Sequence, residues 1–286
     1  MQSTSPMAGR LWILVAALLW STSGLFAKAP LFADWPAGNR GVLLAFWRAL
    51  FAALVLAAAV RRPRWQRELV PVAISFAAMN AIYLTAMGLT TAANAIWLQS
   101  TAPFWVLLVS LLLFRQPVAR RELVPLAFAA LGVGTILAME VRGAATTGVV
   151  LGLVSGLFYG LVVIYMWRLR GEDSAWLVAL CHAISALVLL PWVLRLGIWP
   201  TPAQLAVLSA FGAVQMAVPY LCLIRGLRGI GSQEAVGLGL VEPVLMPLWV
   251  FLAWGEQPAW WTVLGAALIL AGLGIRYFRQ WAVGSG

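Results

Sequence analysis

Long apolar segments separated by short polar clusters fill almost the whole chain. A helix that crosses about 30 Å of hydrocarbon needs about 20 largely apolar residues. The windows between polar clusters predict ten such helices, at residues 10–29, 40–60, 69–88, 91–113, 123–141, 147–167, 174–195, 203–224, 232–254 and 259–278. Because the loops between these windows are short, the pattern predicts an all-α membrane protein with little chain left for a soluble domain.

The apolar pattern also repeats itself 140 residues further along the chain. Eight positions of the first half, Ala95, Leu98, Pro103, Leu108, Leu112, Ala127, Gly132 and Gly134, match Ala235, Leu238, Pro243, Leu248, Leu252, Ala267, Gly272 and Gly274. Five predicted helices fall in each copy, and an odd number turns the second copy upside down in a bilayer. The sequence therefore predicts two inverted five-helix repeats, residues 1–142 and 143–286, an architecture found mainly in transporters.

Composition agrees with this interpretation. With 63% hydrophobic and 10% charged residues, the chain has too little polar material to cover a soluble globule of its length. A net charge of +10 would suggest a nucleic-acid partner in a soluble protein, but the chain contains no nucleic-acid-binding motif. We therefore expect the lipid bilayer and a small-molecule substrate as partners, with no nucleic acid, in a monomer or weak homo-oligomer.

The distribution of basic residues predicts the orientation of the chain. Loops on one side of the predicted helices hold 14 of them: Arg10, Arg61, Arg62, Arg64, Arg67, Arg115, Arg120, Arg121, Arg168, Arg170, Arg225, Arg228, Arg276 and Arg279. The other side holds Lys28, Arg40, Arg142 and Arg195, and Arg48 lies within a predicted helix. Cytoplasmic loops are the basic ones in membrane proteins, so both termini are predicted to face the cytoplasm.

Two other interpretations of the apolar segments are disfavoured. Ala27-Lys28-Ala29 resembles a signal-peptidase site, but cleavage there would leave nine helices and break the pairing of the repeats. A membrane enzyme would need clustered catalytic groups, whereas the predicted helices contain no Asp and the chain has one histidine. No phosphate-binding loop for ATP is present either. We therefore expect no enzyme activity, no cofactor and no metal site, and a membrane receptor or assembly factor is the non-transport alternative.

Two prolines occupy equivalent places in the two halves. Pro103 and Pro243 lie near the middle of predicted helices, where each removes a backbone donor and favours a kink. Such irregularity at membrane depth is tolerated where protein or a watery cavity satisfies the freed carbonyls. The matched pair therefore predicts bends beside a central site.

A stripe of small residues opens the second half. Gly148, Gly152, Gly156 and Gly160 recur at every fourth position, which places them on one helix face. Such a stripe lets helix backbones approach closely in lipid. It predicts either static helix packing or a surface that slides during transport.

Several segments resemble the drug/metabolite transporter superfamily in its EamA-type, ten-helix branch. The resemblance rests on Leu19-Trp20-Ser21-Thr22-Ser23, Phe46-Trp47-Arg48-Ala49, Val241-Glu242-Pro243-Val244 and the segment Leu264-Gly265-Ala266-Ala267-Leu268-Ile269-Leu270-Ala271-Gly272. It implies an exporter of small metabolites in the bacterial inner membrane, with a cavity between the halves. Within the superfamily the chain is most similar to YddG-type exporters of aromatic and other amino acids. Ala102 replaces the acid in the first copy, so any role of Glu242 is not duplicated.

Ionisable groups inside predicted helices are costly and are therefore candidates for function. Arg48 and Glu242 both fall near the middle of their helices, so we expect a buried ion pair that gates or braces the fold, with substrate or proton handling as the alternative. His182 is interpreted as a neutral, hydrogen-bonded core residue, with a protonation switch or a cavity ligand as the alternative. Glu140 and Glu256 lie near helix ends and are interpreted as interfacial.

Uncharged polar and aromatic residues complete the predicted site. An amino acid needs an apolar or aromatic wall and a few placed polar groups for its ammonium and carboxylate. The predicted substrate contacts, for each of which plain packing is the alternative, are Trp20, Ser21, Asn80, Tyr83, Asn94, Trp97, Gln99, Tyr159, His182, Gln215 and Tyr220, and the predicted gating or structural residues are Arg48, Pro103, Glu242 and Pro243.

Overall fold

The computed structural model describes residues 5–114, 120–140, 145–169, 172–230, 235 and 238–284, and every regular element in this part of the chain is a helix. Eight helical segments are long and apolar enough to cross a membrane, and Val241–Trp254 and Trp260–Arg276 are shorter apolar helices. The prediction of an all-α membrane protein is confirmed. The predicted repeat boundary at residues 142 and 143 lies outside the described residues, as do Arg115, Arg142 and Arg170.

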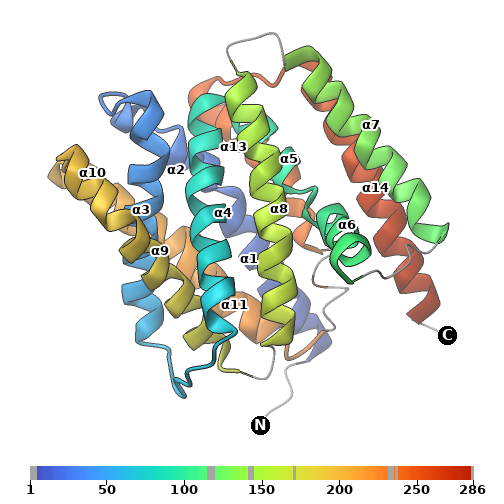
Figure 1. Ribbon diagram of the computed structural model, residues 1–286, viewed down its shortest axis with the longest axis horizontal. Coiled ribbons are helices and arrows are strands. Elements are labelled where there is room, and N and C mark those ends of the chain that lie inside the picture. Colours follow the sequence, from blue (N-terminus) through green and yellow to red (C-terminus); the bar gives the residue numbers. More distant parts are fainter. Residues whose placement is uncertain are drawn as a thin grey trace.

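The first half contains α1 to α7 (Figure 1). Its helices are α1 (Pro6–Ser21), α2 (Ser23–Ala27), α3 (Ala37–Ala57), α4 (Leu69–Leu89), α5 (Ala92–Gln99), α6 (Ala102–Phe114) and α7 (Leu123–Glu140), with short 3-10 turns η1 (Pro30–Phe32) and η2 (Arg120–Glu122). Side chains cap the starts of α1 and α5. Thr91 Oγ1, for example, accepts a hydrogen bond from the Asn94 amide at the start of α5.

The second half contains α8 (Thr146–Arg168), α9 (Ser174–Leu196), α10 (Pro202–Gly212), the π-helical segment η3 (Ala213–Ala217), α11 (Val218–Gly226), α13 (Val241–Trp254) and α14 (Trp260–Gly284). Asp173 caps α9, and Thr201 forms a capping box with Gln204 at the start of α10. Gly197 and Gly255 end α9 and α13 in the left-handed conformation, which glycine adopts without strain.

The two halves run in opposite directions. The helix α1 starts at the end of the molecule that carries Arg61, Arg64 and Arg228, which we call the arginine-rich end. It leads to the opposite end, where α2 stops. The first helix of the second half, α8, starts at that opposite end, because five crossings separate it from α1 (Figure 1). The chain begins and ends near the arginine-rich end, but the side of the membrane on which this end lies stays a prediction.

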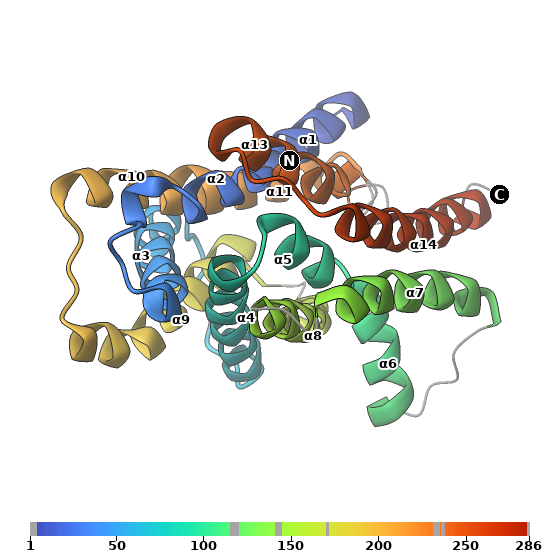
Figure 2. The same ribbon diagram turned by 90° about the horizontal axis from the view of Figure 1, so that it is seen from above.

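Helices of the two halves pack against each other rather than forming separate bundles. The helix α4 packs on α8, α3 on α9, and α1 on α11, while α7 and α14 lie side by side at one edge in both views (Figures 1 and 2). The largest buried apolar cluster draws on both halves, with Leu43, Leu84 and Leu98 from one and Phe211 and Met246 from the other. A site at the centre of the molecule is therefore built from both repeats.

The outer surface is strongly apolar. Leu112, Leu131, Leu187, Leu252 and Trp260 are each more than 60% exposed. A soluble protein does not expose apolar side chains on this scale, whereas lipid tails cover them at no cost. The surface agrees with a protein that spans the bilayer.

Three helices are interrupted at membrane depth. The predicted helix 91–113 is broken between α5 and α6, just before Pro103. In the second half, a turn at Leu240 precedes α13, which contains Glu242 and Pro243 in its first turn. The predicted helix 203–224 contains η3, where Pro219 cannot donate a backbone hydrogen bond to Gln215. The breaks before Pro103 and Pro243 occupy equivalent positions in the two halves.

Candidate functional site

A hydrogen-bonded group of buried polar side chains lies at the centre of the molecule. Arg48 on α3 donates from Nη2 to Asn80 Oδ1 on α4 and from Nη1 to Gln215 Oε1 in η3, at 3.4 Å. Asn80 Nδ2 donates to Ser185 Oγ on α9 and to the Ala45 carbonyl, both at 3.1 Å. All four side chains are at most 2% exposed. We call Arg48, Asn80, Ser185 and Gln215 the central polar cluster, and it joins two helices of each half.

The aromatic surroundings hold the Arg48 side chain in place. Its guanidinium carbon lies 5.0 Å from the ring centre of Phe211, a cation–π contact. Gln215 Nε2 donates to the Trp20 carbonyl at 3.2 Å, which ties η3 to α1. The Arg48 Nε atom is buried and has no hydrogen-bond partner among the described residues. A buried donor without a partner is costly, so this N–H is available to a ligand.

A second contact group joins the N-terminal helices to α13. Ser23 Oγ donates to Met246 Sδ at 3.0 Å, and the Tyr83 hydroxyl donates to the same sulfur at 3.6 Å. Trp249 Nε1 donates to Ser21 Oγ at 2.9 Å. Ser21 and Tyr83 were predicted as site residues from the sequence. Their partners were not, because Met and Trp in an apolar helix give no distinct signal.

His182 lies in an aromatic row at the centre. Its ring centre is 4.8 Å from that of Phe76 and 6.1 Å from that of Tyr220, which in turn is 5.1 Å from Trp20. The side chain is fully buried, and neither ring nitrogen has a hydrogen-bond partner in the described part of the chain. The hydrogen bond expected for a core histidine is thus absent within the described residues, and the role of His182 stays a prediction.

Glu242 stands apart from the hydrogen-bond network. It lies in the first turn of α13, is partly buried and interacts electrostatically with Arg48, Tyr83 and Tyr220. The structure gives this carboxylate no ion pair and no hydrogen bond within the described residues. The expected Arg48–Glu242 ion pair is not formed, because Arg48 points to the amide oxygens of Asn80 and Gln215.

The other predicted contacts are more scattered. Trp97 is 6% exposed in the apolar core, and Gln99 is partly buried at the end of α5. Tyr159 is 41% exposed but interacts electrostatically with Tyr220. Pro103 presents its carbonyl to Arg276 Nη1 at 2.7 Å. The structure therefore gathers Trp20, Tyr83, Arg48 and their partners at the centre, but not every predicted residue.

Asn94 belongs to a different network, at the end opposite the arginines. Its Nδ2 donates to Glu140 at 3.1 Å, and its Oδ1 accepts from Thr262 Oγ1 at 2.7 Å. Glu140 also accepts from Trp261 Nε1 at 3.1 Å. Lys28 forms an ion pair with Glu256 at 2.8 Å. These contacts join the halves, and the interpretation of Glu140 and Glu256 as interfacial stays a prediction.

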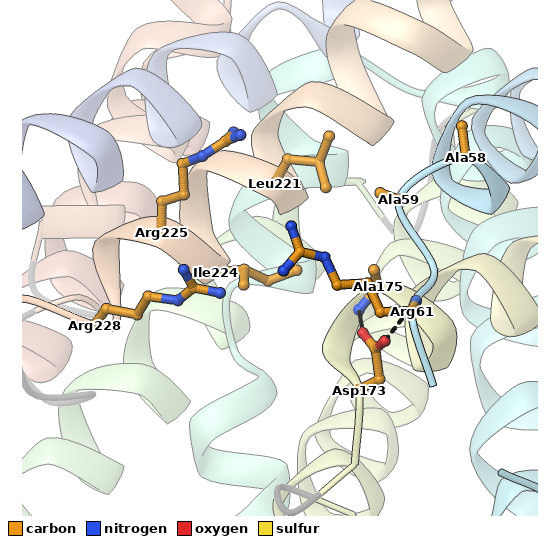
Figure 3. Close-up of a pocket in the computed structure, with 9 residues that line it drawn as sticks. All are labelled: Ala58, Ala59, Arg61, Asp173, Ala175, Leu221, Ile224, Arg225 and Arg228. Atoms are coloured by element: carbon orange, nitrogen blue, oxygen red, sulfur yellow. Dashed lines mark hydrogen bonds between the residues drawn. The ribbon is translucent and has the colours of Figure 1, made fainter. Parts of the chain in front are cut away.

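The arginine-rich end is hollowed instead. A pocket of about 260 Å³ lies between the ends of α3, α9 and α11 (Figure 3), and a neighbouring one of about 600 Å³ shares Arg61, Asp173, Ile224 and Arg228 with it. Within the described residues no group of His, Cys, Asp and Glu could hold a metal ion. The molecule thus has a central polar cluster, hydrogen bonds and an ion pair that join the halves at the end opposite the arginines, and pockets at the arginine-rich end.

Comparison with known proteins shows which family the chain is similar to. The model of the EamA-like transporter family matches the chain twice, at residues 7–138 and 146–277. An uncharacterized transporter of Archaeoglobus fulgidus is 28% identical over 272 residues, which cover 93% of this chain and 94% of that protein. The uncharacterized transporter YwfM of Bacillus subtilis (strain 168) is 30% identical over 131 residues, 44% of each chain.

A solved crystal structure has the same fold. It is 18% identical, covers 95% of this chain and 97% of that one, and superposes with a TM-score of 0.64. The family model covers both halves in turn, which agrees with two repeats. The chain belongs to the EamA-like transporter family of the drug/metabolite transporter superfamily, and it is a multi-pass membrane transporter.

Proposed function

We propose that this transporter exports amino acids with aromatic or other apolar side chains, by alternating access through a central site. The observation that carries the proposal is the pair of unsatisfied groups at the centre. Among the described residues, Glu242 has no ion pair and the buried Arg48 Nε has no acceptor, although both lie in the same region. An amino acid supplies an ammonium group for Glu242 and a carboxylate for Arg48.

The surroundings of these groups suit an apolar side chain. Trp20, Phe76, Tyr83 and Tyr220 lie around the centre, and their rings offer a wall for an aromatic or aliphatic group. Binding sites for small molecules are mostly apolar, with a few polar groups that fix the orientation of the ligand. His182, whose two ring nitrogens have no hydrogen-bond partner in the described part of the chain, adds a further polar group to this wall.

Alternating access follows from how the halves are joined. The central polar cluster links α3 and α4 of the first half to α9 and η3 of the second. Because a substrate at this junction contacts both halves, their rocking exposes it first to one side and then to the other. We further propose that both termini are cytoplasmic, that the membrane is the bacterial inner membrane, and that the protein is a monomer or a weak homo-oligomer.

Energy coupling is proposed to be facilitated diffusion or exchange. Within the described spans, Glu242 is the acid that lies at the centre, which is little material for a proton relay. Reconstituted vesicles with an imposed pH gradient test this point. Uphill amino-acid transport driven by the gradient would contradict it.

The second candidate substrate is an organic cation. A free carboxylate beside aromatic rings attracts a cation through both charge and cation–π contacts. The two candidates differ in what they ask of Arg48. A carboxylate of the substrate needs its N–H groups, whereas a cation gains nothing from them.

A panel of substrates in proteoliposomes distinguishes these candidates. Purified protein is reconstituted and offered radiolabelled amino acids, nucleosides, sugars and organic cations, with protein-free vesicles as the control. We expect saturable exchange of aromatic and apolar amino acids. Exchange of cations alone would overturn the amino-acid proposal, and absence of any flux would favour a receptor.

The Glu242→Gln variant tests the ammonium contact. We expect it to weaken apparent amino-acid affinity by about tenfold or more, because a charge-assisted hydrogen bond becomes a neutral one. Glu68→Gln, at an exposed acid before α4, removes the same charge outside the site and serves as the control. Equal transport by both variants would exclude the contact.

A further inference from the structure

The pocket at the arginine-rich end is unusually basic for its size. We call it the arginine pocket. It comprises the two adjoining hollows of about 260 and 600 Å³, and five arginines line it, namely Arg61, Arg62, Arg64, Arg225 and Arg228. Three come from the segment after α3, Arg225 comes from the end of α11, and Arg228 comes from the turn after it. Two stretches of chain that lie more than 160 positions apart therefore direct positive charge into one space.

The two acids that line the pocket, Asp173 and Glu172, accept their hydrogen bonds from uncharged N–H groups. Asp173 caps α9 and accepts hydrogen bonds from the Ala175 and Trp176 amides, and its other oxygen accepts from the Arg61 and Arg62 amides at 2.9 and 3.0 Å. Burial alone would raise the pKa of Asp173, but these four N–H groups together lower it, so the group stays ionised. Glu172 accepts from the Gln66 amide.

The guanidinium groups are left without counter-charges. Among the described residues, Arg61, Arg62, Arg64 and Arg228 make no side-chain hydrogen bond or ion pair, while Arg225 stacks on Trp12 at 5.5 Å. Figure 3 shows the side chains of Arg61 and Arg228 extending toward each other from opposite walls. Like charges that share a concave site repel each other unless an anion lies between them.

The remaining walls of the pocket are apolar. Ala58, Ala59, Leu221, Ile224 and Leu227 form its inner side. The pocket opens at the ends of membrane-spanning helices, the depth at which lipid phosphates lie. A soluble anion needs only the arginines, whereas an anionic lipid also uses the apolar wall.

We propose that the arginine pocket binds the phosphate of an anionic phospholipid, with the start of an acyl chain against Leu221 and Ile224. Guanidinium groups bind phosphate oxygens in pairs, and basic residues near a membrane surface attract acidic lipids. The proposal does not depend on which substrate the protein carries. It adds a lipid site outside the central polar cluster.

Native mass spectrometry of the detergent-solubilised full chain tests this site. Phosphatidylglycerol is titrated against phosphatidylcholine, and thermal stability is followed in parallel. We expect a saturable phosphatidylglycerol adduct that Arg61→Gln/Arg228→Gln weakens by tenfold or more. Arg67→Gln/Arg120→Gln removes the same charge from exposed residues of the same end and should keep the adduct.

Two further arms make the outcome decisive. Arg61→Lys/Arg228→Lys keeps the charge and is expected to retain part of the affinity, which guards against loss by misfolding. Inorganic phosphate alone should not reproduce the thermal stabilisation by the lipid. The proposal is wrong if both glutamine variants bind equally, if phosphatidylcholine binds as tightly, or if inorganic phosphate protects the protein as well as the lipid does.

Discussion

At the scale of single residues, Asn80 holds the central polar cluster together. It accepts a hydrogen bond from Arg48 and donates to the Ala45 carbonyl and to Ser185. Asn80→Ala would leave a buried guanidinium short of an acceptor, which costs about 3 kcal/mol of folding free energy. Ser185→Ala removes one neutral acceptor and should cost about 1 kcal/mol.

Thermal unfolding in detergent measures this difference. The ranking matters more than the absolute values, because both positions are fully buried and both changes shorten a side chain. If Ser185→Ala destabilises the protein as much as Asn80→Ala does, the charge-assisted bond is not what holds the cluster.

The sequence predicts which residues belong to the site better than it predicts which of these residues contact each other. Arg48 and Asn80 stand out because an ionisable or amide group in an apolar helix is costly. Ser185, by contrast, is a small hydroxyl that a helix can satisfy internally, so its sequence position is uninformative. The expected Arg48–Glu242 pair failed because pairing depends on the rotation of each helix about its axis, and an all-round apolar helix leaves that rotation undetermined.

At the scale of elements, the matched breaks before Pro103 and Pro243 invite a test of bending. Alanine at either position restores a backbone N–H and favours a continuous helix through the break. We expect Pro103→Ala and Pro243→Ala each to fold and insert normally but to transport several-fold more slowly. The measurement is the initial exchange rate in proteoliposomes at matched protein content.

Pro71→Ala is the control for the proline variants. Pro71 lies in the first turn of α4, where a backbone N–H has no helical partner, so its loss should leave the rate unchanged. Full transport by both Pro103→Ala and Pro243→Ala would show that the breaks do not bend during the cycle.

The glycine stripe on α8 makes a further prediction at this scale. A Cβ at Gly156 would lie 2.8 Å from the Leu98 carbonyl and 2.9 Å from Thr101 Oγ1, beside the break between α5 and α6. Gly156→Ala should therefore destabilise the protein by about 1–3 kcal/mol, measured by thermal unfolding. Gly134→Ala, on a helix face with nothing within 4 Å, should be neutral or slightly stabilising.

The sequence predicts the positions of the helices, but it predicts only some of the breaks inside them. Apolar length predicted most spans to within a few residues, since crossing the bilayer demands it. The start of the predicted helix 232–254 lies outside the described residues, and α14 extends beyond the predicted end at residue 278. Pro103 and Pro243 indicated kinks, and next to them the structure has short turns in the helices, at residues 100–101 and at Leu240. The π-helical η3 was not predicted, because Pro219 marks a missing bond without showing how the chain rearranges around Gln215.

At the scale of the whole molecule, the two ends differ in how the halves are joined. At the end opposite the arginines, Glu256 pairs with Lys28 and accepts from the Ala92 amide at 2.6 Å, and Lys28 donates to the Thr90 carbonyl at 2.6 Å. The arginine-rich end is hollowed between α3, α9 and α11. Alternating access requires the linked end to open.

Weakening this link should therefore shift the population toward a state open at the opposite end. Ser23, which is 2% exposed and contacts Met246, reports on access to the centre once it is changed to cysteine in a Cys181→Ala/Cys222→Ala background. We expect Glu256→Gln to raise the labelling rate of Ser23→Cys by several-fold, with a membrane-impermeant thiol reagent applied from the Lys28 side of oriented vesicles.

The size of this effect is limited by the partial exposure of the pair. Lys28 and Glu256 side chains are 19% and 22% exposed, and ion pairs in contact with water contribute little. Glutamine keeps an oxygen for the Ala92 amide, so the change removes the charge without removing the contact. Because Glu68→Gln neutralises an exposed acid at the other end, equal labelling in that variant would trace the increase to altered surface charge rather than to opening.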